Sequence, residues 1–123
     1  MSDVLIVDDE PQVRRFATRV LRQHGFATIE ACDGTEALQC VNQMGQLLRL
    51  VVSDIVMPGI NGVELMERLS TARPNLPVIL MSGYSPFELG ERGIAVPCGM
   101  LSKPFPPEDL IAEVVRCIGA PAA

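Results

Sequence analysis

Short apolar runs alternate along this chain with segments whose apolar residues recur every three or four positions, and no other feature restricts its fold as much. An unbroken apolar run such as Val4–Val7 is typical of a strand that is buried on both faces. The recurrence between residues 13 and 21 is typical of a helix with one buried side. Strands that alternate with helices predict an α/β fold with a parallel sheet and right-handed crossover connections.

The expected strands are 4–7, 27–31, 50–53, 77–81 and 98–102, and the expected helices carry the apolar residues of 13–21, 37–44, 63–69 and 106–118. Asp33 is a good N-cap for the second helix, and Gly45 ends that helix. The last helix is expected to bury Leu110, Ile111, Val114, Val115 and Ile118. Between 86 and 97, internal glycines each cost a helix about 1 kcal/mol relative to alanine, which predicts a short, mobile fourth helix there.

Length and composition bound the function classes. The 123 residues suit one ordinary domain, expected over 1–120, with 121–123 as a terminal tail or linker stub. A net charge of −5 without a dense basic cluster argues against direct nucleic-acid binding. No apolar run approaches the roughly 20 residues that membrane insertion requires. The four cysteines (Cys32, Cys40, Cys98 and Cys117) lack Cys-x-x-Cys spacing, so we expect reduced packing residues in a cytoplasmic protein.

Polar side chains follow four of the expected strands. Asp8, Asp9 and Glu10 come after the first strand, Asp54 after the third, Ser82 after the fourth and Lys103 after the fifth. Ligands of parallel α/β sheets bind outside the carboxyl ends of the strands. Each feature alone also fits an ordinary turn, helix cap or surface position. Their joint arrangement predicts a site at one rim of the sheet.

The residue types at this rim predict a divalent cation and a phosphoryl group. Crowded carboxylates repel one another unless some are protonated or a cation joins them. Oxygen ligands suit Mg²⁺, and Mn²⁺ as a substitute, whereas zinc prefers histidine and cysteine, and His24 lies at the far end of the first helix. Lys103 and Ser82 would bind phosphoryl oxygens while a carboxylate attacks phosphorus in line.

Four segments in order resemble the response-regulator receiver domain of two-component signal transduction over essentially the whole chain. They are 4–10 (VLIVDDE), 54–59 with 61–62 (DIVMPG and NG), 81–83 (MSG) and 103–105 (KPF). The resemblance implies a doubly wound (βα)5, flavodoxin-like, three-layer sandwich with strand order 2-1-3-4-5. It also implies that Asp54 is the phosphoacceptor.

The resemblance further implies the roles of the other site residues. Asp9, Asp54 and the backbone carbonyl of Val56 would ligate Mg²⁺ directly, and Asp8 would act mainly through a metal-bound water. Ser82 and Lys103 would contact the acyl phosphate. The bond between Lys103 and Pro104 is expected to be cis.

The sequence departs from the family at Met100, three residues before the lysine, where many members carry a Tyr or Phe that swings inward on activation. We expect a conformational switch built from Ser82, Tyr84 and Met100, in which a flexible thioether replaces the usual aromatic ring. Tyr84, with Val56, is expected to shield the acyl phosphate from water, although a loop aromatic that covers the fourth helix is the alternative interpretation.

The predicted function is therefore a phosphoryl-accepting signalling domain, not an enzyme that acts on other substrates. Its partner would be a histidine kinase or a histidine phosphotransfer domain, bound transiently through Gln12, Arg15 and Arg19 and through the loop 105–107. Two other functions fit the sequence less well. A hydrolase with an aspartyl nucleophile would need an Asp-x-Asp pair and a cap, whereas the acids here are adjacent and the length leaves no room for a cap. A flavin module would need a hydroxyl-rich phosphate loop where this chain has acidic residues. An inactive receiver is disfavoured by the complete set of site residues. A stand-alone regulator, the receiver of a hybrid sensor kinase and the receiver of a larger multi-domain regulator all remain open.

Overall fold

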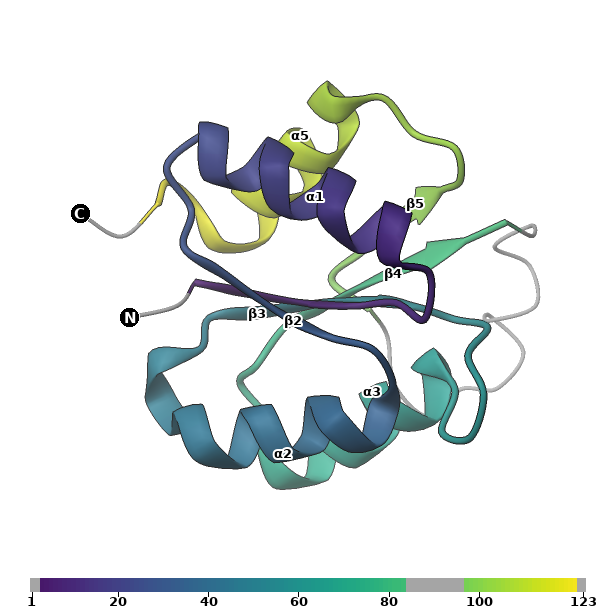
Figure 1. The fold of residues 1–123 in the computed structure, drawn as a ribbon. Coiled ribbons are helices and arrows are strands. Elements are labelled where there is room, and N and C mark those ends of the chain that lie inside the picture. The colour runs from purple at the N-terminus through teal and green to yellow at the C-terminus, as the bar shows by residue number, and fades with distance from the viewer. Residues whose placement is uncertain (1–2, 84–96, 122–123) are drawn as a thin grey trace.

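The computed structural model describes residues 3–83 and 97–121, and in these residues a five-stranded parallel sheet lies between two layers of helices (Figure 1). The strands are β1 (Val4–Val7), β2 (Thr28–Ala31), β3 (Leu50–Asp54), β4 (Val78–Ser82) and β5 (Gly99–Ser102). The helices are α1 (Pro11–Gln23), α2 (Gly34–Met44), the short 3-10 helix η1 (Gly45–Leu47), α3 (Gly62–Ala72) and α5 (Pro107–Ile118). The strand order β2-β1-β3-β4-β5 confirms the predicted doubly wound fold.

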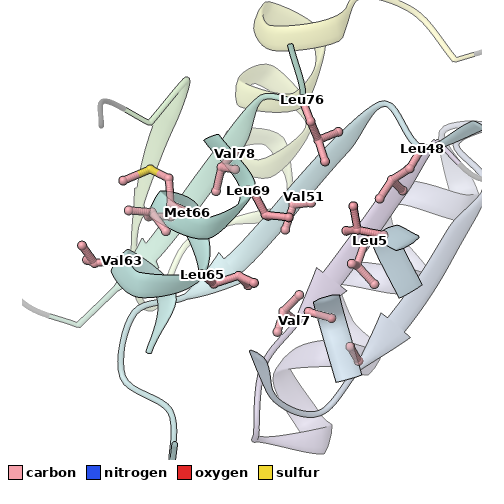
Figure 2. Close-up of a cluster of buried hydrophobic side chains, with 14 of the residues drawn as sticks. Leu5, Val7, Leu48, Val51, Val63, Leu65, Met66, Leu69, Leu76 and Val78 are labelled. Carbon is pink, nitrogen blue, oxygen red and sulfur yellow. The ribbon is translucent and has the colours of Figure 1, made fainter. Parts of the chain in front are cut away.

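The two faces of the sheet bury alternate residues of the same strands, because side chains point to opposite faces at successive positions. Leu5 and Val7 of β1 pack with Val51 and with Leu65 and Leu69 of α3, on the side covered by α2 and α3 (Figure 2). The alternate β1 residues, Val4 and Ile6, pack on the other side, beneath α1 and α5. Every residue of β1 is buried, as the unbroken apolar run predicts.

The ends of β3 and β4 extend further than predicted. Asp54 and Ser82 are the last residues of their strands, not the first residues of loops. Sheet pairing continues past them, since the Ile55 N–H donates to the Met81 carbonyl (3.0 Å) and the Lys103 N–H donates to the Ser82 carbonyl (2.8 Å). The sheet therefore holds both side chains in place.

The predicted cap of α2 is confirmed, because the Asp33 carboxylate accepts a hydrogen bond from the Glu36 N–H at 2.8 Å. The predicted inner face of α5 is wrong in one residue. Val115 is 43% exposed, whereas Leu110 and Val114 are buried and Cys117 and Ile118 pack against the core. The reason is geometric, since Val115 is rotated about 100° around the helix from Val114.

The expectation that all four cysteines are reduced is also wrong. Cys98, just before β5, and Cys117, in the last turn of α5, form a disulfide. They are 19 residues apart in sequence, and only the return of α5 along the sheet brings them together. Cys32 and Cys40 have free thiols.

The fourth helix predicted between 86 and 97 falls on 84–96, outside the described residues. Within 3–83 and 97–121, no helix has both the length and the apolar character needed to cross a bilayer.

Candidate functional site

The sheet register brings the carboxyl ends of four strands to one rim. Val7 pairs with Ser53, so that Asp8 and Asp54 extend next to each other from β1 and β3. Ser82 pairs with Ser102, and Lys103 follows directly. The structure thus collects residues that are separated by up to 95 positions in the sequence.

Asp8 is a fully buried carboxylate whose two oxygens have different partners. Oδ1 accepts a hydrogen bond from the Glu10 N–H at 2.9 Å, and Oδ2 pairs with Lys103 Nζ at 2.9 Å. Burial of an ionised carboxylate is costly unless its charge is paired and its oxygens accept hydrogen bonds. The local turn and the distant lysine meet this cost together.

Asp54 shares the same lysine. Its Oδ1 lies 3.3 Å from Lys103 Nζ, and the residue is 6% exposed. Burial raises the pKa of Asp54 above the ordinary value, and the charge of Asp8 raises it further, while Lys103 pulls the pKa back down. One ammonium therefore pairs with two buried carboxylates.

Lys103 is held in its charged form by this arrangement. Burial opposes the ammonium, but the hydrogen bond to Asp8 and the charges of Asp54 and Asp8 outweigh burial and raise the pKa of Lys103. The Lys103–Pro104 peptide bond is cis, which confirms that prediction.

The other predicted site residues lie around this core. Asp9 and Glu10 are exposed, and carboxylate oxygens of Asp8, Asp9 and Glu10 lie within 4.8 Å of one another. Glu10 joins this cluster although no metal role was predicted for it. Val56 follows β3, with its side chain 58% exposed.

The predicted switch residues are only partly placed. Ser82 is buried at the end of β4, and its carbonyl binds the backbone that leads into Lys103. Met100 is half-buried in β5 and packs against the core on the α2 and α3 side. Tyr84 lies outside the described residues.

Two residues that support the site were missed in the sequence. Arg14 of α1 donates from Nη1 to the Asp8 carbonyl at 2.7 Å and pairs with Glu30 at 3.3 Å. Its only sequence signal is a basic residue near the buried side of α1. Gly62, at the start of α3, packs so closely behind the acceptor strand that a Cβ there would lie 2.2 Å from the Asp54 carbonyl oxygen.

An apolar groove of about 430 Å³ opens beside Lys103. It is lined by Gln12, Val13, Phe16, Lys103, Pro104 and Phe105. The rings of Phe16 and Phe105 meet with centroids 6.0 Å apart. Of the predicted docking residues, Gln12 and Phe105 line this groove, whereas Arg15 and Arg19 line a separate hollow of α1 with Glu30.

Comparison with known proteins points to one family. The model of the response regulator receiver domain matches residues 4–115. The chain is 36% identical over 114 residues to the sensor kinase CckA of Brucella abortus, covering 92% of this chain and 12% of CckA. It is 28% identical to the response regulator receiver protein CpdR of the same organism, covering 96% of this chain and 98% of CpdR.

A solved structure shows the same likeness. The response regulator protein TrrA of Thermotoga maritima, in complex with Mg²⁺ and BeF, has a TM-score of 0.84 and 29% identity to this chain. The match covers 96% of this chain and all of TrrA (100%). The chain therefore spans a small part of one relative and nearly the whole of others.

Proposed function

The chain belongs to the response regulator receiver domain family, and from that premise we propose that Asp54 is its phosphoryl acceptor. Receiver domains accept phosphate in two-component and phosphorelay signalling. The observation that carries the assignment to Asp54 is the single ammonium of Lys103, which Asp54 shares with the buried Asp8 at 3.3 and 2.9 Å. The two carboxylates carry one more negative charge than Lys103 balances, and a further cation would reduce the repulsion between them.

Mg²⁺ is the cation that we propose, with Mn²⁺ as a substitute. Asp9, Asp54 and the Val56 carbonyl would hold it directly, and Asp8 would act through a bound water. These oxygen donors fit a hard cation, which keeps several waters of its own. When bound, Mg²⁺ would offset negative charge at the rim and orient phosphoryl oxygens.

The chain's own groups supply the remaining chemistry. Lys103 favours the ionised form of Asp54, whose carboxylate oxygen would attack phosphorus in line while the imidazole nitrogen of the donor phosphohistidine leaves. Lys103 and the hydroxyl of Ser82 would then bind the phosphoryl oxygens. Because Lys103 contacts both carboxylates before transfer, phosphorylation would redistribute its contacts, which we propose as the first event of the switch toward Met100 and Tyr84.

We propose that the phosphate comes from a histidine kinase or a histidine phosphotransfer domain that docks transiently on α1 and on the loop after Lys103. The apolar groove with Phe16 and Phe105 lies next to Lys103, and this position supports docking close to the acceptor. The chain would act by protein contact in the cytoplasm, where the ATP used by histidine kinases is found, and would promote only its own phosphorylation and dephosphorylation. The receiver unit would comprise residues 1–120.

Incubation with acetyl phosphate and Mg²⁺, followed by intact mass measurement, tests the acceptor. The wild-type chain should gain one phosphoryl group, and Asp54→Asn should gain none. Glu67→Gln, which removes one carboxylate charge from the middle of α3, is the matched control and should behave as the wild type. A full-yield adduct in Asp54→Asn would refute the assignment.

Phosphotransfer from a phosphorylated histidine phosphotransfer domain tests the docking surface. Phe16→Ala removes one wall of the groove without touching Asp54, so it should slow transfer from the protein donor and leave the reaction with acetyl phosphate unchanged. Equal slowing with both donors would mean that Phe16 supports the fold and not docking.

A further inference from the structure

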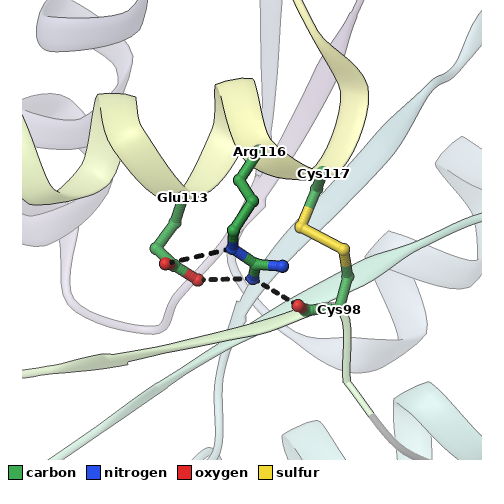
Figure 3. The surroundings of a disulfide bond; sticks show 4 residues. All are labelled: Cys98, Glu113, Arg116 and Cys117. Carbon is green, nitrogen blue, oxygen red and sulfur yellow. Dashed lines mark hydrogen bonds and ion pairs between the residues drawn. A yellow bond between two sulfur atoms is a disulfide. The ribbon is translucent and has the colours of Figure 1, made fainter.

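The disulfide between Cys98 and Cys117 lies away from the phosphoryl rim and takes no part in the chemistry proposed there. It joins the residue just before β5 to the last turn of α5 (Figure 3). Lys103 follows the opposite end of the same strand. The bond thus links α5 to the strand that carries the site lysine.

The backbone places the two cysteines for bonding without help from the sulfur atoms. Their Cα atoms are 6.1 Å apart, within the range that disulfides adopt. Cys98 is held by its N–H, which donates to the Val78 carbonyl at 2.7 Å, and by its carbonyl, which accepts from Arg116. The end of α5 is held by Arg49, whose Nη2 donates to the Ile118 carbonyl at 2.6 Å. Two free thiols would therefore stay within reach of each other.

The surroundings of the bond favour exchange with small thiols. Both cysteines are only half-buried. Arg116 contacts the Cys98 carbonyl through its guanidinium and pairs with Glu113 at 2.8 Å, so an ion pair lies next to Cys98 (Figure 3). Cys117, and not Cys98, lines a hollow, so an external thiolate that enters the hollow reaches the Cys117 sulfur and Cys98 is the leaving group.

The hollow lined by Cys117 is polar and has a volume of about 450 Å³. Two arginines, Arg49 and Arg73, line it together with Gln46 and Asn75. Arg49 is already paired with Asp3 at 3.0 Å, which leaves Arg73 as the cation in the hollow without an ion pair among the described residues. Guanidinium and amide groups are suited to bind carboxylates.

We propose that Cys98 and Cys117 form a reversible redox site, whose reactants are small carboxylate-bearing thiols and disulfides that enter this hollow. In the reducing direction, an external thiolate attacks the Cys117 sulfur, the protein S–S bond breaks, and Cys98 leaves as a thiolate beside Arg116. A second external thiolate attacks the mixed disulfide at the external sulfur and releases Cys117. The two external thiols give two electrons and two protons to the two cysteines and become one external disulfide, and oxidation is the reverse.

Oxidation also fixes the position of α5 against β5. The bond closes a loop of about 20 residues, and the lost freedom of the unfolded chain should raise Tm by about 10 °C relative to the reduced chain. Without the bond, the last turn of α5 is held by Arg49, Arg116 and apolar contacts. Disulfide formation would thus be a second covalent change that alters the domain, at a site separate from Asp54.

Redox titration with glutathione tests the pair. The chain with Cys32→Ser and Cys40→Ser keeps only Cys98 and Cys117, and it would be equilibrated without denaturant in mixtures of reduced and oxidised glutathione, alkylated, and weighed intact. Alkylated cysteines should fall from two to none in a single step, with Tm rising by about 10 °C. Alkylation at two cysteines in fully oxidised glutathione, accumulation of a glutathione adduct, or reduction only after unfolding would each overturn the proposal.

The class of reactant is tested by rates of reduction. Arg73→Ala removes positive charge from the hollow and should slow reduction by glutathione roughly fivefold relative to reduction by the uncharged 2-mercaptoethanol. Arg68→Ala removes an exposed arginine of α3 that does not line the hollow, and should leave that ratio unchanged. An unchanged ratio in Arg73→Ala would refute binding of carboxylate-bearing thiols. Comparing rates within each variant cancels any general loosening of the fold.

Discussion

Gly62→Ala should disturb the acceptor strand although Gly62 carries no side chain and contacts no ligand. An added Cβ would lie 2.2 Å from the Asp54 carbonyl oxygen, 2.8 Å from the Ile55 Cα and 2.9 Å from the Asp54 carbonyl carbon. Real Cβ atoms stay beyond about 3.0 Å from such neighbours, and all three of these atoms belong to the backbone. The start of α3 and the end of β3 must therefore separate.

The separation has two measurable costs. Overpacking of this kind lowers the free energy of unfolding by about 1–3 kcal/mol. The Gly62 N–H donates to the Ile55 carbonyl at 2.8 Å, so the shift is transmitted to the residue that follows Asp54. A displacement near 1 Å at a reacting group slows a positioned reaction by about 10²-fold. We therefore expect slower phosphorylation in a chain that still folds.

Urea unfolding and phosphorylation by acetyl phosphate would measure the two effects. Gly83→Ala is the control for stability, because no atom of the described residues lies within 4 Å of a Cβ at that position and its φ is not positive. It should change the free energy of unfolding by less than about 1 kcal/mol. If Gly62→Ala unfolds at the wild-type urea concentration and is phosphorylated at the wild-type rate, close packing behind Asp54 does not constrain the acceptor.

Further predictions concern the charges of the rim and one helix cap. Because the pKa of Asp54 is raised in the fold, ionisation of Asp54 lowers the stability of the fold as pH rises above the ordinary pKa of 3.8. In Mg²⁺-free buffer, Asp54→Asn should therefore have a higher Tm than the wild type at pH 7 and the same Tm near pH 3. A lower Tm of the Asn variant at pH 7 would contradict this. Lys103→Met leaves Asp8 and Asp54 without their ammonium and should lower the free energy of unfolding by about 3–5 kcal/mol at pH 7. Since the pKa of Lys103 is raised, its stabilisation is complete below 10.5 and is lost as pH rises through the raised pKa, so the two urea midpoints should converge at strongly alkaline pH and a constant gap would argue against the pairing. Asp33→Ala removes the cap of α2 and should cost about 1 kcal/mol in urea unfolding while the phosphorylation rate stays unchanged.

Local patterns predicted most of the fold because their causes are local. The apolar run Val4–Val7 can only be buried on both faces, and the structure buries all four residues. Asp33 caps α2 through a hydrogen bond to a residue three positions away. The apolar residues of α5 were assigned to its buried face by the same logic, and the one error, Val115, lies at the edge of that face, where periodicity alone does not separate buried from exposed.

The candidate site was predicted in outline for a different reason. Strands of a parallel sheet end at a common rim, so the residues that follow the strands can be predicted to lie close together even when their contacts are not known. The spacing of Asp8, Asp54, Ser82 and Lys103 therefore sufficed to place them together, and resemblance to the family supplied their expected roles. It did not predict that Lys103 bridges both carboxylates in this structure.

By itself, the sequence determined the class of fold, the order of its elements and the chemical types at the rim, because periodicity, caps and strand ends depend on neighbours in the chain. The tertiary structure decided which groups touch: Arg14 on the Asp8 carbonyl, Gly62 behind Asp54, and Cys98 bonded to Cys117. These contacts depend on the distance and angle at which a helix packs on the sheet after a crossover. That geometry is set by side-chain packing across the whole core, and no short pattern in the sequence encodes it.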